Sequence, residues 1–580
     1  MLYRFREKIK PMHQLIKTTK DFFIRNIWLG LVLFLAFGAR LYGIYFDYPY
    51  TDFIWDETYS ISYLFDLLTQ KTVLVNPPSS TYPTLLPFLL APVFVLRLGY
   101  IALMNGLHSI AELKNFIVMN GLGQIHIISR WYSVFFGTAT VYLVYGIIRR
   151  IYRKRSVALY TALVYSFSLV PVYLSHWGKH HATMVFFVIL SLLFVIIFEE
   201  KKVKKYVYFS MFAAAAAFSV HYIGATAVVF PFWAWWSNRR DFNNKEIIKC
   251  ILFFGGIGAF FYLSNFYGVK SMLHQIIFDY YAKNDWGGIV PTGRWERFYY
   301  VFRDSFMIEP IFTALFFALG LKFKRLIKNN RLWGYIFAGL LFNYLLMITI
   351  IVGAHLSRWL LTFITLITLV SASLFYNWLL ERSWRKEIKI FLAIIFILPN
   401  VYFTIHWLGL LRNNTALEAE AWLENNVKKD EYIYSFMISF NAPLSLESME
   451  WNYHNNDRFR NMRKIVLVLE NKERFRDKKG LAIMYDDRNN RYDNLAGEKT
   501  KYIIADGGSI KDLEKTRREL EKYHALELVR SFYPTENIEI TNEGLDNDYL
   551  NSPEKLSTLY HLDKSGPFID IYKVKGDYND

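Results

Sequence analysis

The chain has little of what a soluble enzyme or a cross-linked secreted protein usually carries. A single cysteine, Cys250, stands among 580 residues, which excludes an intramolecular disulfide and any metal cluster held by several cysteines. Charged residues make up only 20% of the chain, whereas soluble domains carry roughly 25%. In their place, 53% of the residues are hydrophobic and 18% are aromatic. A soluble enzyme with one core, a disordered chain and a fibrous chain are therefore all excluded.

Long apolar runs recur from Ile27 to Leu411, and many approach the roughly 20 residues that a membrane helix needs. Eleven of these runs are predicted to cross a membrane. They are Ile27–Tyr45, Trp131–Ile148, Val157–Ser175, Ala182–Phe198, Tyr206–Val220, Gly224–Trp236, Ile247–Gly268, Ile311–Leu321, Leu332–Gly353, Trp359–Leu380 and Ile388–Leu411. The predicted fold class is a polytopic α-helical membrane protein with about 11 transmembrane helices.

Positive charge is concentrated in short connectors between the apolar runs. The net charge of +17 divides into +22 for residues 1–411 and −5 for residues 412–580. Five basic connectors alternate with connectors poor in positive charge: Arg149–Arg155, Lys201–Lys205, Arg239–Lys249, Lys322–Arg331 and Arg382–Lys389. Basic loops between spans are typical of the cytoplasmic side. A nucleic-acid-binding protein would instead gather its basic residues on one soluble face, so nucleic acid is not an expected partner.

This charge pattern predicts the topology of a multi-pass protein of the plasma (inner) membrane. Residues 1–26 are expected to form a cytoplasmic arm, not a cleaved signal peptide, because no small-residue cleavage site follows the first apolar run. Residues 27–411 form the transmembrane domain, with large outer loops at 46–129 and 269–309. Tyr82–Met104 is long enough to cross, but crossing would place every later basic connector outside. We therefore interpret it as a juxtamembrane or re-entrant helix that contains three prolines, Pro83, Pro87 and Pro92.

From Arg412 the composition becomes charged and polar, which predicts a small extracytoplasmic α/β domain over residues 412–580. Two helices are expected at Thr415–Val427 and Lys511–Tyr523. Strands are expected at Tyr432–Phe436, Ile465–Leu469, Tyr502–Ala505 and Phe568–Val574. No motif in this domain indicates a chemical function.

An acidic pair, Asp56 and Glu57, stands in the first outer loop shortly after the first span. Ile61, Leu64 and Leu68 follow it at helical spacing, as in an amphipathic helix lying on the membrane. Asp56 is a candidate general base, because a carboxylate at the membrane surface can take a proton from an acceptor hydroxyl. The alternative is an N-cap, in which the carboxylate accepts backbone N–H bonds.

Further polar residues fall at the outer ends of the predicted spans. Arg130 opens a span and can either snorkel or hold a lipid phosphate. The connector at 176–181 is rich in histidine and contains Lys179, but adjacent histidines on a helix rarely bind one metal ion, so contact with a phosphate is favoured over a metal site. The other candidates share this outer side and are His180, His181, His221, His355 and Arg358. Polar residues at membrane depth are expensive and usually functional.

These motifs, in this order, resemble those of polytopic glycosyltransferases that use polyprenyl-phosphate sugars, such as protein O-mannosyltransferases and the aminoarabinose transferases that modify lipid A. The resemblance covers roughly residues 25–435. The matching features are Asp56-Glu57, the Pro-containing segment that begins at Tyr82, Arg130 before Gly137-Thr138, the basic turn at 146–152, His355-Leu-Ser-Arg358-Trp-Leu-Leu361, and Ala421-Trp-Leu-Glu-Asn-Asn426.

The resemblance implies a GT-C architecture and transfer of a sugar, with inversion, from a polyprenyl-phosphate donor to a hydroxyl or phosphate of a glycan, lipid or protein acceptor. It implies Asp56 as the base and Glu57 as its orienting neighbour. Arg130, Lys179, His180 and Arg358 are the candidates for balancing the charge of the donor phosphate, with Tyr82, His181, His221 and His355 as further site residues. No cofactor is implied beyond the lipid-linked donor and membrane lipid; no motif indicates a metal ion, although a divalent cation is left open. The alternatives are a ligase for lipid-linked glycans, a secondary transporter and a non-catalytic scaffold.

Overall fold

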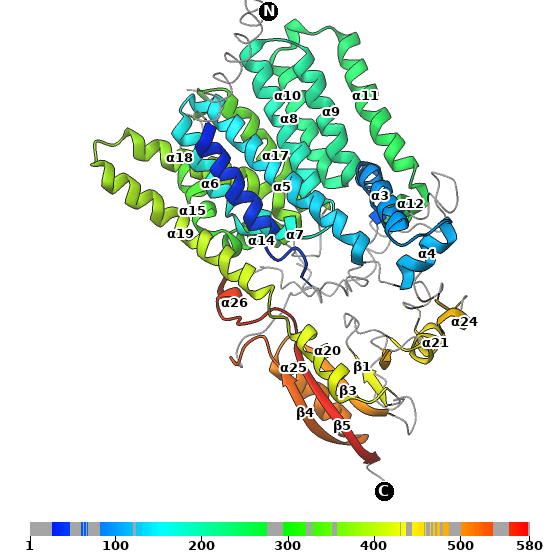
Figure 1. Ribbon diagram of the computed structural model, residues 1–580. Coiled ribbons are helices and arrows are strands. Elements are labelled where there is room, and N and C mark those ends of the chain that lie inside the picture. The colour runs from blue at the N-terminus through cyan, green and yellow to red at the C-terminus, as the bar shows by residue number, and fades with distance from the viewer. Residues whose placement is uncertain are drawn as a thin grey trace, which may run out of the picture.

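The computed structural model shows a helical bundle followed by a small mixed α/β domain (Figure 1). It describes residues 26–46, 60–61, 63–64, 67, 82–119, 123–274, 294–320, 326–328, 330–350, 357–429, 431–436, 444–456, 459, 465, 468–469, 472–475, 480–485, 500–537 and 556–577. The predicted fold class, a polytopic helical membrane protein with a C-terminal sheet domain, is confirmed.

Each predicted span coincides with helical structure. The first is the helix Asn26–Leu41. The bundle helices that follow are α5 (Gly123–Tyr152), α6 (Arg155–Ser166), α7 (Leu169–His176), α8 (His181–Lys201), α9 (Lys205–Val220), α10 (Val229–Ser237), α11 (Asn244–Leu263), α15 (Pro310–Gly320), α17 (Leu332–Ile350), α18 (Ser357–Glu381) and α19 (Lys386–Leu410). Two departures matter for the site. The expected span Val157–Ser175 is broken into α6 and α7, which meet at 54°, and a 3-10 segment, Tyr222–Val228, precedes α10.

Five helices of the described residues are long and apolar enough to cross a membrane, or six if α6 and α7 form one bent span. One of the five is α3 (Leu85–Met104), which the charge pattern predicts not to cross. At its amino end α3 packs on α5 and α11. The Tyr132 hydroxyl of α5 donates to the Leu89 carbonyl at 2.8 Å, and the Thr84 N–H donates to the Phe261 carbonyl of α11 at 3.2 Å. Figure 1 places α3 beside α4 (Ile110–Met119) and α12 (Phe266–His274), at the end of the bundle that faces the C-terminal domain. Length and composition alone allow α3 to cross, so the count of eleven spans stays a prediction.

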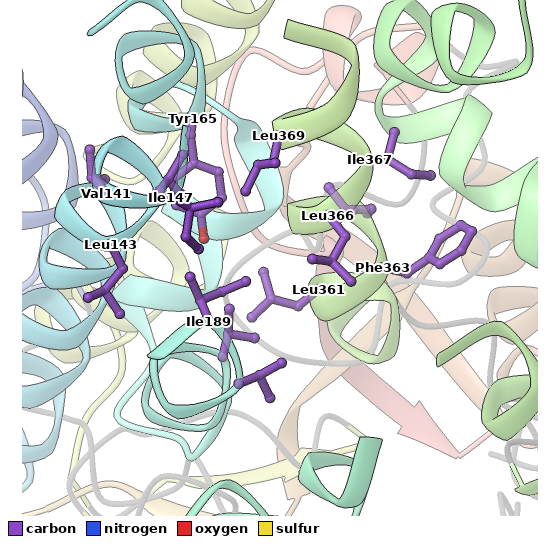
Figure 2. Close-up of a cluster of buried hydrophobic side chains, with 14 of the residues drawn as sticks. Val141, Leu143, Ile147, Tyr165, Ile189, Leu361, Phe363, Leu366, Ile367 and Leu369 are labelled. Carbon is purple, nitrogen blue, oxygen red and sulfur yellow. The ribbon is translucent and has the colours of Figure 1, made fainter. Parts of the chain in front are cut away.

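The bundle core is built from apolar side chains of α5, α6, α8 and α18 (Figure 2). Val141, Ile147, Ile189 and Leu366 are completely buried there. α19 differs from these helices, because only 22% of its apolar window is buried, against 56% for α5 and 83% for α18. It therefore presents many of its apolar residues outward, as a lipid-facing helix does.

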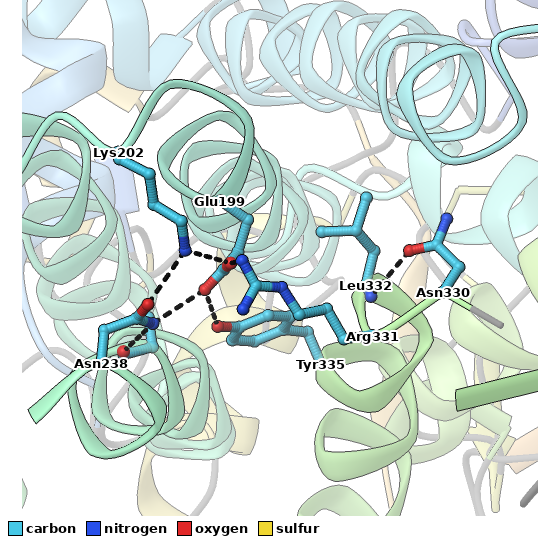
Figure 3. Close-up of polar contacts among 8 residues, drawn as sticks. Glu199, Lys202, Asn238, Asn330, Arg331, Leu332 and Tyr335 are labelled. Carbon is cyan, nitrogen blue, oxygen red and sulfur yellow. Dashed lines mark hydrogen bonds and ion pairs between the residues drawn. The ribbon is translucent and has the colours of Figure 1, made fainter. Parts of the chain in front are cut away.

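The basic connectors meet at one end of the bundle. Glu199, near the end of α8, lies at the centre of a network that contains the Tyr335 hydroxyl at 2.6 Å and Arg331 Nη2 at 2.6 Å (Figure 3). Lys202 Nζ lies 2.7 Å from the same carboxylate, and Asn238 Nδ2 donates to it at 2.9 Å. Contacts between the remaining basic connectors are Arg150–Glu200, Asn330–Ile151 and Lys154–Glu381. The connectors that were predicted to share one side of the membrane therefore share one end of the bundle.

Labelling from outside tests which end faces out. In a Cys250→Ser background, a cysteine at the exposed Ala111 of α4 is expected to react with an impermeant maleimide in intact cells. A cysteine at the exposed Val203, in a basic connector, is the matched control and should react only after lysis. The reverse pattern would contradict the predicted orientation and mean that α3 crosses the membrane.

The C-terminal domain is a five-stranded sheet in the order β2-β1-β3-β5-β4. Its strands are β1 (Tyr432–Ser435), β2 (Ala482–Tyr485), β3 (Thr500–Gly507), β4 (His524–Phe532) and β5 (Phe568–Asp577). β1 is parallel to β2 and β3, whereas β5 is antiparallel to β3 and β4. The main helices are α20 (Thr415–Asn426), α21 (Leu446–Asn455) and α25 (Ile510–Leu520). The mixed α/β domain is as expected.

One predicted strand in this domain is wrong. The described residues within Ile465–Leu469 are helical, and Ile465 and Val468 are both buried. A spacing of three residues places both side chains on one face of a helix, so the burial pattern explains why a segment rich in β-branched residues is not a strand. β2 and β4 were not predicted.

The sheet domain contacts the bundle through α26 (Leu556–Tyr560). The His406 ring nitrogen Nε2 of α19 lies 2.9 Å from the Leu559 carbonyl oxygen, and the rings of Tyr402 and Tyr560 are 6.5 Å apart. Leu559 and Leu562 are buried as part of the bundle core. The domain is therefore anchored at the bundle end opposite the basic connectors (Figure 1).

Candidate active site

The residues predicted to form the site are only partly within the described part of the chain. Asp56, Glu57 and His355 lie outside it. Arg358 is the second residue of α18, and its side chain is not among those described. The remaining candidates can be placed, and all lie at the end of the bundle opposite the basic connectors. These are Tyr82, Arg130, Lys179, His180, His181 and His221.

Five aromatic side chains from three separate segments gather into one cluster, here called the histidine cluster: Tyr82, His180, His181, His221 and Tyr222. The rings of His180 and His221 are stacked, with centroids 4.1 Å apart and planes at 16°. The Tyr82 ring lies 4.3 Å from His180 and 5.4 Å from His221. His181 lies 4.2 Å from His180, and Tyr222 lies 4.0 Å from His221. All three histidines are buried, at 3% exposure or less.

Local structure explains how three segments deliver these rings. His180 is the N-cap residue of α8, and its carbonyl accepts the first bond of that helix from the Met184 N–H at 2.8 Å. His221 is extended, with φ −159° and ψ 142°, because the chain leaves α9 there and turns into the 3-10 segment. The backbone of Tyr82 is held by Asn265, which lies just beyond the end of α11 and whose Nδ2 donates to the Tyr82 carbonyl at 2.7 Å. The cluster therefore depends on α3, α8, α9 and α11 together.

One hydrogen bond indicates the protonation state of the His221 ring. Its Nδ1 lies 3.2 Å from the Ile223 backbone N–H, which is a donor, so Nδ1 must be an acceptor. The imidazole is then neutral, with its proton on Nε2. A neutral His221 can stack on His180 without the repulsion that two cationic rings at this distance would suffer. Its Nε2–H is a donor suited to an anionic oxygen or a sugar hydroxyl.

The turn before His180 carries Lys179 and packs closely on α5. Lys179 is 2% exposed, and its Nζ lies 3.4 Å from the centre of the Trp177 ring, a cation–π contact. Its carbonyl accepts from the Ser133 hydroxyl at 3.3 Å. A Cβ at Gly178 would lie 2.1 Å from the Ser129 hydroxyl oxygen, so only glycine permits this approach. The turn therefore holds a buried Lys179 side chain on the residue directly before His180 of the histidine cluster.

Arg130 is completely buried and lies near the start of the candidate membrane span of α5. Its Nη1 donates to the carbonyls of Ile44 at 3.0 Å and Phe46 at 2.8 Å, and its guanidinium lies 3.8 Å from the centre of the Phe46 ring. These contacts attach the end of the first helix to α5. Phe46 directly precedes the segment that carries Asp56, so Arg130 holds the point from which that segment starts.

Two residues that sequence reasoning missed belong to this end of the bundle. His176 is completely buried, and its Nε2 lies 2.7 Å from the Tyr42 carbonyl oxygen, which fastens the end of α7 to the first helix. Arg40 is also completely buried, and its Nη1 donates to the Ser166 carbonyl at 3.2 Å. Arg40 carried a signal, since it is a lone charge within the first apolar run, and such a charge is usually functional.

The arrangement combines fixed positive charge, neutral hydrogen-bond donors and aromatic faces. Cationic groups near a developing negative charge favour departure of a phosphate leaving group, and aromatic faces suit the apolar face of a sugar ring. Within the described ranges no group of three or more His, Cys, Asp and Glu side chains is placed to hold a metal ion. The cationic groups and N–H donors of the described residues can bind and orient an anion.

A comparison with known families links part of this chain to membrane glycosyltransferases. Residues 119–263 match the family described as dolichyl-phosphate-mannose-protein mannosyltransferase. The matched segment runs from the start of α5 to the end of α11 and contains Arg130, Lys179, His180, His181 and His221. The resemblance predicted from the sequence is thus confirmed for the part of the bundle that forms the described site.

Solved structures with low sequence identity also align over most of the chain. ArnT from Cupriavidus metallidurans in the apo state aligns at 11% identity with a TM-score of 0.46, covering 88% of this chain and 96% of that one. The oligosaccharyltransferase of Archaeoglobus fulgidus in the apo form aligns at 10% identity with a TM-score of 0.43, covering 87% of this chain and 73% of that one. Among proteins with a curated function, none matches this chain significantly in sequence.

Proposed function

We propose that the protein transfers a sugar from a polyprenyl-phosphate donor to an acceptor hydroxyl or phosphate, with inversion, on the outer face of the membrane. The observation that carries the proposal is the convergence of Tyr82, Arg130, Lys179, His180 and His221 at the bundle end opposite the basic connectors. The family that matches residues 119–263 is named for such a donor, dolichyl-phosphate mannose.

The acidic pair fits this location because both flanks of its segment lie there. On one side, Phe46 is held by Arg130. On the other, Ile61 is completely buried in an apolar cluster with α3, and the Tyr63 ring lies 6.2 Å from Phe88. The described residues on either side, Phe46 and Ile61, therefore lie at the same end of the bundle as the histidine cluster. Asp56 and Glu57 stand between these flanks in the sequence, which supports the proposal that they act there.

The proposed reaction is a single displacement. The acceptor oxygen attacks the anomeric carbon while the bond from that carbon to the donor phosphate oxygen breaks, so the configuration inverts. The proton of an acceptor hydroxyl passes to Asp56, and Glu57 orients Asp56 or the acceptor. The leaving polyprenyl phosphate gains negative charge, which Lys179, Arg130 and Arg358 would balance. His180 and His221 then bind the phosphate oxygens or the sugar through N–H donors.

Comparing lipids and glycans from cells with and without the protein tests this function. The expected result is one glycan, lipid or protein that loses a single sugar in the deletion strain, together with accumulation of a polyprenyl-phosphate sugar. Restoration by the wild-type gene, but not by Lys179→Ala, would connect the loss to the described site. Loss of a whole glycan block, without accumulation of a monosaccharide donor, would identify a ligase instead.

A further inference from the structure

The break between α6 and α7 is held by side chains from distant parts of the chain. Arg40, in the first helix, donates to the carbonyl of Ser166, the last residue of α6. Thr404, in α19, donates at 2.8 Å to the carbonyl of Phe167, the residue after α6. Carbonyls at a helix end have no partner within the helix and are costly to bury. These two contacts therefore make the end of α6 tolerable inside the bundle.

Glu309 does the same for the start of α7. Its Oε1 accepts from the Ser168 hydroxyl at 2.6 Å and from the Leu169 N–H at 3.1 Å. Its Oε2 accepts from Asn400 Nδ2 of α19 at 2.5 Å. Glu309 is only 2% exposed, so all three hydrogen bonds are made away from solvent. The Arg40 guanidinium complements the dipole of α6 at its carboxyl end, and the Glu309 carboxyl oxygens complement the dipole of α7 at its amino end.

Glu309 also joins α7 to the second outer loop. It lies directly between α14 (Arg294–Ile308) and α15, and its N–H donates to the Ser305 carbonyl at 2.9 Å. α7 runs for eight residues from Leu169, which Glu309 contacts, to His176. At 1.5 Å per residue, this is a rigid length of about 12 Å. The turn with Lys179 and the start of α8 with His180 follow at once. The position of Glu309 therefore decides where α7 begins, and α7 decides where the turn lies.

We propose that Glu309 is a positioning residue for the active site, acting through α7 on Lys179 and His180. Its effect on catalysis rests on the proposed function, whereas its effect on α7 does not. Because Glu309 accepts hydrogen bonds on both carboxyl oxygens, whereas a glutamine has only one acceptor oxygen, Glu309→Gln should release the start of α7 by about tenfold in its opening equilibrium.

A cysteine reporter measures the position of α7 without any substrate. Ser175, on α7, is 1% exposed and packs at Gly137, so Ser175→Cys in a Cys250→Ser background should react slowly with a maleimide in the purified protein. Ser191→Cys, on α8, is the matched reporter, since Ser191 is equally buried and hydrogen-bonded to Ser210. Glu309→Gln is expected to raise the labelling rate of the Ser175→Cys reporter about tenfold and to leave that of the Ser191→Cys reporter unchanged.

Glu199→Gln is the matched control, because Glu199 is also a buried carboxylate with several partners but lies at the opposite end of the bundle. It should lower the unfolding temperature comparably, yet leave the Ser175→Cys reporter and the donor kcat/KM within about twofold. Glu309→Gln should lower the donor kcat/KM about tenfold. If Glu309→Gln prevents folding, Asn400→Ala is the substitute, because it removes one of the three hydrogen bonds that Glu309 accepts. The labelling rate of the Ser175→Cys reporter is then expected to rise about threefold.

Two outcomes overturn the inference. One is a folded Glu309→Gln protein whose Ser175→Cys reporter is labelled at the wild-type rate. The other is equal labelling increases in the Glu309→Gln and Glu199→Gln proteins, which would show general loosening. Neither depends on transfer activity. If labelling changes as expected but no polyprenyl-phosphate sugar is consumed by the wild type, the proposed function fails and the structural role of Glu309 stands.

Discussion

Asp56→Asn is expected to lower sugar transfer by about 10²–10⁴-fold while the protein still folds and binds its donor. Asparagine keeps the size of the side chain and can accept the same backbone N–H bonds, but it cannot take up the acceptor proton. An aspartate in a partly hydrated site is ionised at neutral pH, since its reference pKa is about 3.9. Turnover and unfolding temperature of the purified variant measure the two effects separately.

The matched comparison is Glu57→Gln, the neighbouring carboxylate in the same segment. An orienting residue should cost less than the base, so a smaller fall in turnover is expected. If Asp56 serves only as an N-cap, both variants should be nearly wild type in stability and transfer. An active Asp56→Asn protein would therefore remove the proposed base, without affecting the fold.

Arg130→Gln is expected to lower donor kcat/KM by roughly 10- to 150-fold, equivalent to about 1.5–3 kcal/mol for one charge-assisted contact. The glutamine amide can still donate to one of the two carbonyls, Ile44 or Phe46, that Arg130 Nη1 now binds. The substitution therefore removes the charge and spares part of the anchoring. Steady-state kinetics at limiting donor, with thermal unfolding alongside, is the measurement.

Arg150 provides the control, because it lies at the other end of the same helix, α5. It donates to the Gly146 carbonyl at 3.0 Å and pairs with Glu200 at 3.3 Å, among the basic connectors. Arg150→Gln should leave donor use within about twofold. Equal losses in the Arg130→Gln and Arg150→Gln proteins would show that charge in α5 supports folding only and would remove Arg130 from the phosphate site.

The apolar helices of the bundle were predictable because composition reports directly on environment. Apolar runs mark segments in contact with lipid or core, and the basic connectors mark one side. The break after Ser166 carried one local signal, Pro171 in the first turn of α7, because a proline cannot donate to the carbonyl of Phe167 four residues earlier. The contacts that stabilise the break were not predictable, since they come from Arg40, Glu309 and Thr404, which stand 126 or more residues away from their partners in the sequence. Contacts of that range leave no local pattern.

Part of the candidate site was predictable for the same reason. Alternating connectors imply that Lys179, His180 and His221 share one side, and the structure brings them together. The stacking of His180 on His221 depends on how α8 and α9 pack, which periodicity does not reveal. In the sheet domain, β4 was missed because it is an edge strand in which only the last residue, Phe532, is buried, so the usual alternation of apolar and polar residues is weak.

The anomeric configuration of the product tests the central claim most directly. Purified protein in liposomes is supplied with a polyprenyl-phosphate sugar of known configuration and with the acceptor identified from the deletion strain. Nuclear magnetic resonance of the product then reads the new glycosidic bond. A single displacement with Asp56 as base predicts complete inversion in the wild type and almost no product from Asp56→Asn. Retention of configuration, or unchanged product from Asp56→Asn, would contradict the mechanism.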